Sequence, residues 1–115
     1  MDVEELYNKG FGFRCGGQYG EAREVFQQVL AVNPAHKGSL HQMALIRGFL
    51  GEFDESLQEL QALSTQYPDD NDIRYDLAMT HMMLGDYEAG CFNLKKILAT
   101  DPTHEKALQQ AIYCQ

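Results

Sequence analysis

Apolar side chains recur along this chain with the spacing of helix faces, and glycine and proline interrupt the pattern at regular intervals. In one run, Leu40, Met43, Ala44 and Arg47 stand at i, i+3, i+4 and i+7, which is one face of an α-helix. Gly51 follows, and glycine ends a helix at little conformational cost because it readily adopts positive φ. The pattern therefore predicts a helix that ends just before Gly51.

A second helix is predicted directly after this turn. Its apolar face consists of Phe53, Leu57, Leu60 and Leu63. Pro68 ends this helix, because proline disfavours the helical conformation in the residue before it. Asp70 or Asn71 can then cap the next helix with its side chain. The segment is thus a pair of helices joined by a tight turn.

The pattern repeats every 34 residues. The clearest sign is the spacing of the three prolines, Pro34, Pro68 and Pro102. A turn glycine, the aromatic residue after it, two large apolar positions and two small-residue positions keep the same period. These sets are Gly17, Gly51 and Gly85; Tyr19, Phe53 and Tyr87; Phe26, Leu60 and Leu94; Val29, Leu63 and Ile97; Gly10, Ala44 and Ala78; and Ala22, Ser56 and Gly90. A fixed period of this size indicates stacked repeats, in which neighbouring units bury one another's apolar faces.

These residues resemble the tetratricopeptide repeat (TPR) family, whose motif runs W-x2-L-G-x2-Y, then A-x3-F, then P, and the resemblance covers essentially the whole chain. It implies an all-α fold, a right-handed α-solenoid of three helix-turn-helix units and a C-terminal capping helix, seven helices in all, within one domain over residues 1–115. The expected boundaries are 3–36, 37–70 and 71–104 for the repeats and 105–115 for the capping helix. That last helix is expected to begin near Thr103, to run to the end of the chain and to cover the apolar edge of the third unit.

The sequence departs from the family motif at several positions. Tryptophan is replaced by Leu6, Leu40 and Arg74, the first leucine of one unit by Lys9, and the aromatic that Phe13 supplies in the first unit by Arg47 and His81. The first unit is also rich in glycine, which weakens a helix by up to about 1 kcal/mol per residue. We expect this N-terminal unit to fray first.

The first helix of each unit carries a second apolar stripe, beyond the one that packing requires. The resemblance implies that these helices line the concave side of the stack, and residues four apart share a helix face. The groove residues predicted in this way are Tyr7, Phe11, Arg14, His41, Leu45, Phe49, Asp72, Tyr75, Asp76, Met79, Met82 and Met83, with Glu4, Cys15, Gly38 and Gly48 on the same side. We hypothesise that the groove binds an apolar peptide or an amphipathic helix. The alternative is that neighbouring helices partly cover the stripe.

Some members of the family clamp the C-terminal carboxylate tail of heat-shock chaperones with Lys, Asn, Asn, Lys and Arg. The matching positions here are Tyr7, Phe11, Gln42, Asp72 and Asp76. None of them matches, and the two aspartates would repel a carboxylate. We therefore expect no binding of such tails. The aspartates, with Asp69 and Asp70, favour either a Lys- or Arg-bearing partner or simply a solvated acidic turn.

The charge of the chain narrows the choice of partners. Nine basic residues face seventeen acidic ones, for a formal net charge of -8, and the one adjacent basic pair is Lys95-Lys96. Nucleic acid and anionic membrane surfaces are therefore not expected partners. No run approaches the roughly 18 apolar residues of a membrane span, and residues 1–5 lack the order of a signal peptide. We expect a cytoplasmic location.

Residues suited to catalysis or metal binding have simpler interpretations. Cys15, Cys91 and Cys114 are odd in number and lack zinc spacing, which favours free thiols in a reducing compartment. Cys15 is expected to be a packed thiol and not a nucleophile served by His41. His81 is expected on the packing face, away from the methionines that would share a soft-metal site. We expect no cofactor, no metal and no enzymatic activity.

The sequence therefore predicts an interaction scaffold or chaperone-like adaptor that holds a partner segment in its concave groove. The alternative is a self-assembly module that forms homo-oligomers, and an enzyme is a remote alternative. The partner, the pathway, the organism and the oligomeric state are not encoded in the repeat pattern, and the chain could be a fragment of a larger protein.

Overall fold

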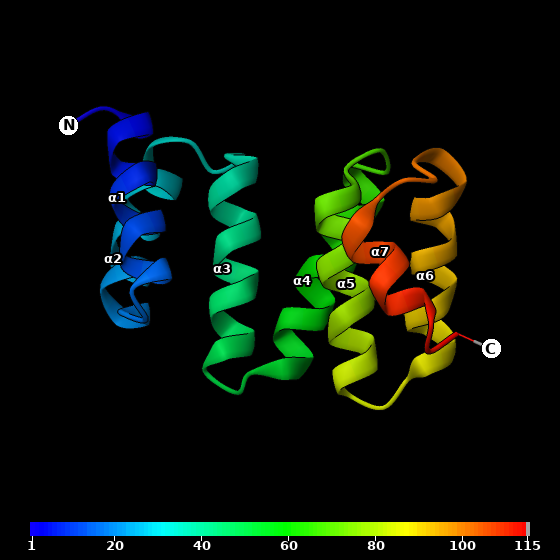
Figure 1. The fold of residues 1–115 in the computed structure, drawn as a ribbon. Helices are drawn as coiled ribbons and strands as arrows, with labels where there is room; N and C mark the ends of the chain where they lie inside the picture. The colour runs from blue at the N-terminus through cyan, green and yellow to red at the C-terminus, as the bar shows by residue number, and fades with distance from the viewer. Residues whose placement is uncertain (115) are drawn as a thin grey trace. The chain divides into compact units, whose positions relative to one another are not determined.

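A computed structural model describes residues 1–114 and contains, within them, seven α-helices and no strand (Figure 1). The helices are α1 Val3–Cys15, α2 Tyr19–Val32, α3 Lys37–Phe49, α4 Phe53–Gln66, α5 Asn71–Met83, α6 Tyr87–Thr100 and α7 Glu105–Ala111. Across the part of the chain that is described, no helix has the length and apolar character that crossing a membrane would require.

The turns between paired helices depend on glycine. Gly17, Gly51 and Gly85 have φ values of 78°, 85° and 85°, a region that strongly favours glycine. The 34-residue spacing of these glycines is therefore the spacing of the turns, as the sequence predicts.

The helices α1, α3, α5 and α7 are each capped by a side chain, and the capping residues recur every 34 positions. Asp70, and not Asn71, caps α5, because its carboxylate accepts hydrogen bonds from the backbone N–H groups of Asp72 and Ile73 at 3.0 and 3.1 Å. Asp2 caps α1 in the same way, and His36 and His104 cap α3 and α7 through Nδ1. A helix predicted near Thr103 thus begins at Glu105.

The chain forms two compact units, Met1–Ser56 and Leu57–Gln115. In the N-terminal unit, α2 contacts both α1 and α3, and Ala22, Phe26, Met43 and Ile46 form a buried cluster. Gly10 lets α1 approach this cluster: a methyl group placed on it would lie 2.8 Å from the Phe26 ring. The small residues of the repeat are therefore positions of close helix approach.

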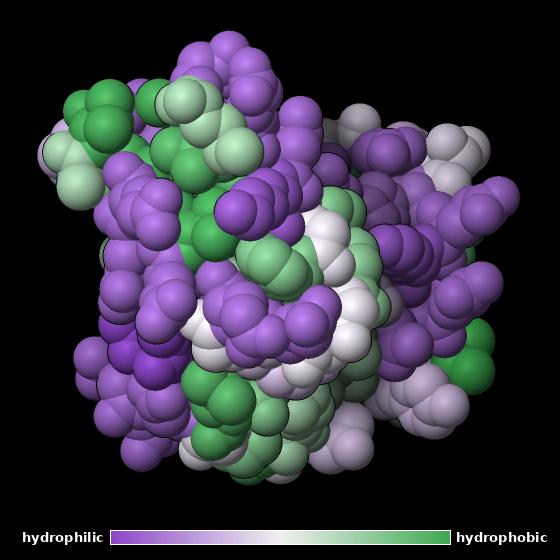
Figure 2. All heavy atoms as spheres, turned by 90° about the vertical axis from the view of Figure 1, so that its left-hand side faces the viewer, coloured by the Kyte–Doolittle hydropathy of each residue, from purple (hydrophilic) through white to green (hydrophobic). Residues whose placement is uncertain are grey.

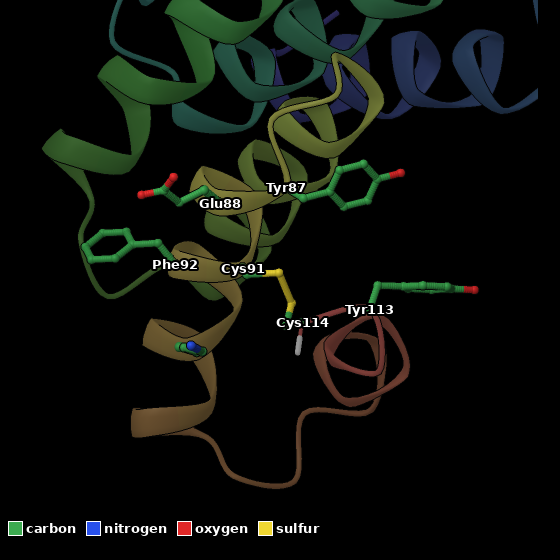
Figure 3. Close-up of a pocket in the computed structure, with 7 residues that line it drawn as sticks. Tyr87, Glu88, Cys91, Phe92, Tyr113 and Cys114 are labelled. Atoms are coloured by element: carbon green, nitrogen blue, oxygen red, sulfur yellow. A yellow bond between two sulfur atoms is a disulfide. The ribbon is translucent and has the colours of Figure 1, made fainter.

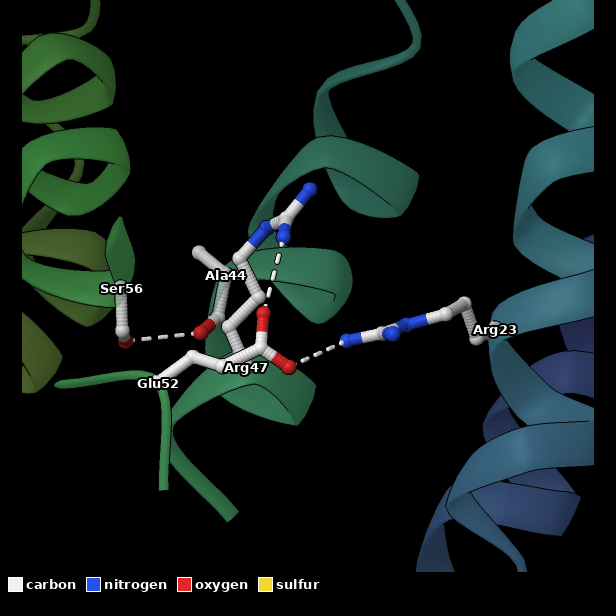
Figure 4. Close-up of polar contacts among 5 residues, drawn as sticks. All are labelled: Arg23, Ala44, Arg47, Glu52 and Ser56. Atoms are coloured by element: carbon white, nitrogen blue, oxygen red, sulfur yellow. Dashed lines mark hydrogen bonds and ion pairs between the residues drawn. The ribbon is translucent and has the colours of Figure 1, made fainter. Parts of the chain in front are cut away.

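An ion-pair network joins α2 to the turn after α3 in the N-terminal unit (Figure 4). Arg23 and Arg47 donate to the two carboxylate oxygens of Glu52 at 3.1 and 3.2 Å. The hydrogen bond from Arg23 is the largest cause that holds the pKa of Glu52 below its usual range. Arg47, which replaces an aromatic residue of the family motif, thus takes a polar structural role.

In the C-terminal unit, α5 packs against α6, and α6 contacts α7. Ala78, Met82, Leu94, Ile97 and Ala107 form its buried cluster. Gly90 allows the close approach here, because a methyl group on it would overlap the Met82 side chain and lie 3.1 Å from the carbonyl oxygen of Ala78.

The cysteines differ from the sequence expectation. Cys91 and Cys114 form a disulfide, so the prediction of free thiols is wrong for these two residues. Cys15 is free, but it is exposed, and the expectation of a packed thiol is also wrong. A separation of 23 residues gives no local signal of pairing, because the fold alone brings the two cysteines together.

The capping helix is shorter than the sequence predicts. α7 ends at Ala111, and a turn follows at residues 112–113. Because the helix ends here, the chain can turn and bring Cys114 to its disulfide partner, Cys91 on α6. The predicted helix is therefore wrong for residues 112–114, which are not helical. Gln115 lies outside the described residues.

Candidate peptide-binding surface

The predicted groove stripe is covered to different degrees along each first helix of the N-terminal unit. In α1, Tyr7 is half-buried and Phe11 is 38% exposed. In α3, His41 and Leu45 are half-buried and Phe49 is 51% exposed. Exposure thus increases toward the C-terminal ends of these helices.

Tyr7 is partly a packing residue. Its ring centroid lies 5.7 Å from that of Phe26, 5.2 Å from that of His36 and 6.3 Å from that of Phe11. Burial raises the pKa of the Tyr7 phenol above its ordinary value, and the nearby Arg14 charge opposes this shift. Tyr7 is therefore only partly available to a ligand.

The more exposed members of this stripe also have intramolecular neighbours. Phe49 stacks on Tyr19 with a centroid distance of 5.0 Å, and the Arg14 guanidinium lies 4.9 Å from the centre of the Phe11 ring. Figure 2, which faces the side of the N-terminal unit where α1 and α2 lie, shows apolar side chains as islands between polar ones. The alternative that neighbouring helices partly cover the stripe thus describes much of this unit.

In the C-terminal unit, Tyr75 in the N-terminal half of α5 is partly covered by α7 and its cap. Tyr75 stacks on His104 at 6.1 Å, and Lys106 lies 5.7 Å from the centre of the Tyr75 ring. Burial raises the pKa of Tyr75, and the Asp76 carboxylate adds to the shift. Tyr75 therefore anchors the capping helix as well as facing the predicted groove.

The C-terminal half of the α5 stripe opens into an apolar pocket of about 300 Å³. The pocket is lined by Met79, Met82, Met83, Tyr87, Gln110 and Tyr113. Met82 is only 7% exposed and belongs to the core, so it forms the floor, whereas Met83 is 66% exposed. Three predicted groove residues thus come together in one concave, mostly apolar site.

Half of the pocket lining was not among the predicted groove residues. Tyr87 begins α6, and its sequence signal was its register as the aromatic residue after the turn glycine. Gln110 and Tyr113 come from α7 and the turn after it, where nothing in the repeat pattern marks a ligand-facing residue.

A second open pocket, of about 430 Å³, lies beside the disulfide (Figure 3). Tyr87, Glu88, Cys91, Phe92, Lys95, Tyr113 and Cys114 line it. In Figure 3 the rings of Tyr87 and Tyr113 lie on one side of the disulfide and Phe92 on the other. Tyr87 and Tyr113 therefore belong to both pockets.

The α5 stripe is acidic where it begins. Asp72 is exposed and Asp76 is half-buried, and each is one or two turns before Met79 on the same helix face. The unit as a whole carries nine acidic and four basic residues. The electrostatic potential beside the pocket is thus negative, which disfavours the binding of anionic ligands.

Helix pairs joined by glycine turns, with apolar first-helix faces left partly open, define a helical-repeat protein of the interaction type. The tetratricopeptide repeat family profile matches residues 52–112, just over half of the chain. The chain belongs to this family, and the all-α repeat fold predicted from the sequence is confirmed.

Curated proteins match this chain at low sequence identity. Subunit 2-A of the ER membrane protein complex from Xenopus laevis is 24% identical over 101 residues, which are 88% of this chain and 34% of that protein. The chain thus spans about a third of the length of the curated relatives it matches.

Two solved structures have a fold similar to that of this chain. MamA (residues 41 to the end) from Desulfovibrio magneticus RS-1 is 26% identical with a TM-score of 0.80, over 95% of this chain and 62% of that one. PcrH, solved in complex with the chaperone binding region of PopB, is 21% identical with a TM-score of 0.79, over 98% of this chain and 94% of that one.

Proposed function

We propose that this chain is a protein-interaction adaptor that holds a partner peptide by an apolar anchor side chain. The observation that carries the proposal is the pocket of Met79, Met83, Tyr87 and Tyr113, because it is concave, apolar and open to solvent. Methionine adapts to varied partner surfaces, and tyrosine contributes a large contact area at low entropic cost. Membership of the TPR family supports a binding role over a catalytic one.

The partner segment is proposed to be an amphipathic helix with a basic flank. Apolar residues at i, i+3, i+4 and i+7 would seat one side chain in the pocket and others on the exposed apolar residues beside it in the C-terminal unit. A Lys or Arg of the same segment would face the Asp72 carboxylate, which is solvent-exposed. Three or four anchors, each contributing about 1–2 kcal/mol net, correspond to roughly micromolar binding. PcrH, which binds a region of PopB, is a precedent of similar fold. The cytoplasmic location stays a prediction.

The test is titration with amphipathic helical peptides that carry Leu, Phe or Met on one face and Lys on the other, followed by fluorescence anisotropy. Met83→Glu should weaken binding by at least about tenfold, because a bound apolar side chain would cover the new carboxylate and remove its hydration. Val32→Glu is the matched control, since Val32 is equally exposed, at 69%, but lies on α2 away from the predicted groove. Equal binding by the two variants, with unchanged helicity, would refute the pocket as the site.

Self-assembly is a second candidate, favoured by the apolar residues that α7 and its turn leave in solvent. Leu108, Ile112 and Tyr113 are 47%, 65% and 61% exposed. Light scattering across a concentration series tests this directly. A mass that stays monomeric at all concentrations would count against it.

A further inference from the structure

The C-terminal segment is fastened to the rest of its unit by a covalent bond. Cys114, three residues after the end of α7, is bonded to Cys91 in the second turn of α6. Since Cys114 follows Tyr113 directly, the bond fixes the position of a residue that lines the apolar pocket.

The N-terminal end of α7 is held by packing and by its cap. Ala107 is fully buried, and His104 both caps the helix and stacks on Tyr75. Toward the C-terminal end, Leu108 and Ile112 are 47% and 65% exposed, and Gln110 and Ala111 are only half-buried. A helix of seven residues has little stability of its own, so its C-terminal end depends on what holds it there.

Among the described residues that line the pocket, Gln110 and Tyr113 come from this end of the chain, and the other four belong to α5 and α6. Loss of the bond would therefore free one wall of the pocket and leave the opposite wall in place. Residues 110–114 thus contain both this wall of the pocket and the cysteine that fastens it.

The disulfide is also within reach of solvent reagents. Both cysteines are half-buried, and both line the open pocket of about 430 Å³. Thiol–disulfide exchange requires that an attacking thiolate reach one sulfur, which this pocket permits. A disulfide sealed in the core would not offer this access.

We propose that the Cys91–Cys114 disulfide is a redox latch that regulates peptide binding at the apolar pocket. The oxidised chain holds Gln110 and Tyr113 as a wall and is the form that binds. In reduction, the thiolate of a low-molecular-weight thiol such as glutathione attacks one sulfur, and a second such thiol resolves the mixed disulfide. The products are two cysteine thiols and one glutathione disulfide, and the reverse reaction with glutathione disulfide closes the latch. A reducing compartment would thus open it. The effect on binding rests on the proposed function, whereas the release of the segment does not.

The release is tested by hydrogen exchange of the full chain with and without a dithiol reductant. Reduction should raise the count of titratable thiols from one to three and should speed amide exchange in residues 108–114 by at least about tenfold. Exchange in α1 should not change. Cys114→Ser should show fast exchange in both conditions, and Cys15→Ser should behave like the native chain, because Cys15 lies outside the latch. Equal exchange before and after full reduction would overturn the latch.

The regulation is tested by repeating the peptide titrations in both redox states. We expect the dissociation constant to rise about tenfold on reduction and in Cys91→Ser or Cys114→Ser, but not in Cys15→Ser. Equal affinity in the two states would overturn the regulation. If exchange responds to reduction but no peptide binds in either state, the proposed function fails and the redox-sensitive latch stands.

Discussion

The hydroxyl of Ser56 donates a hydrogen bond of 2.7 Å to the backbone carbonyl of Ala44, with both residues buried. The bond joins α4 to α3 at a point where only small side chains fit, and the hydroxyl lies 3.3 Å from the position that a methyl group on Gly48 would occupy. Figure 4 shows this contact beside the Glu52 ion pairs.

Ser56→Ala should lower the free energy of unfolding by about 1 kcal/mol, because a buried hydrogen bond is lost with little change in volume. Urea denaturation followed by circular dichroism measures the effect. Thr65→Ala is the matched control: its hydroxyl also donates to a carbonyl, that of Gln61 at 2.9 Å, but the residue is exposed. The control should change the stability by less than about 0.5 kcal/mol.

Two glycines of α1 should respond oppositely to the same substitution. Gly10→Ala should destabilise the chain by about 1–3 kcal/mol, because the new methyl group meets the rigid, fully buried Phe26 ring. Gly12→Ala should stabilise it by up to about 1 kcal/mol, because the site is open and alanine is the better helix former. Thermal unfolding of the two variants measures both. Equal shifts would mean that helix propensity, and not packing, governs this face.

The contrast between these glycines shows what the sequence encodes. A small residue that recurs every 34 positions, such as Gly10 with Ala44 and Ala78, is buried in the structure, and a methyl group on Gly10 would meet the Phe26 ring. Gly12 has no such register and faces open space. Periodicity therefore predicted the helices, the turns and the core, because stacking imposes the same constraint on each unit.

The candidate site was predictable only where it follows the repeat. Met79 and Met83 were found from their spacing on α5, whereas Tyr113 and Cys114 follow α7, where the chain leaves the repeat pattern. Helical spacing also cannot say how far a neighbour covers a residue. Tyr75 shows this, because the His104 ring that stacks on it comes from the next helix cap.

The Glu52 network should make stability depend on acidity. Its carboxylate pKa is lowered in the folded chain, so its contribution is fully present above the unfolded pKa of about 4.3 and is lost as the pH falls through the folded value. Glu52→Gln should therefore be less stable than the native chain near neutral pH, and the difference should disappear in acid. Denaturant titrations at several pH values measure this. A difference that persists unchanged in acid would point to packing instead of charge.

An acidic C-terminal tail peptide, of the kind that some TPR proteins clamp, should not bind this chain. The positions that would hold its carboxylates carry Asp72 and Asp76 on α5, and the unit around them has an acidic balance. Like charges at such a site raise the free energy of the complex, more so at low salt. Isothermal titration with the tail peptide and with its amidated form should show no heat of binding for either. Changing both aspartates to asparagine should remove the repulsion without creating a clamp, because the Lys and Arg donors that the clamp uses are still absent from these positions. Saturable binding of the free-acid peptide to the native chain would show that another cationic surface captures it, and Lys95 and Lys96 on α6 would then be the first residues to replace.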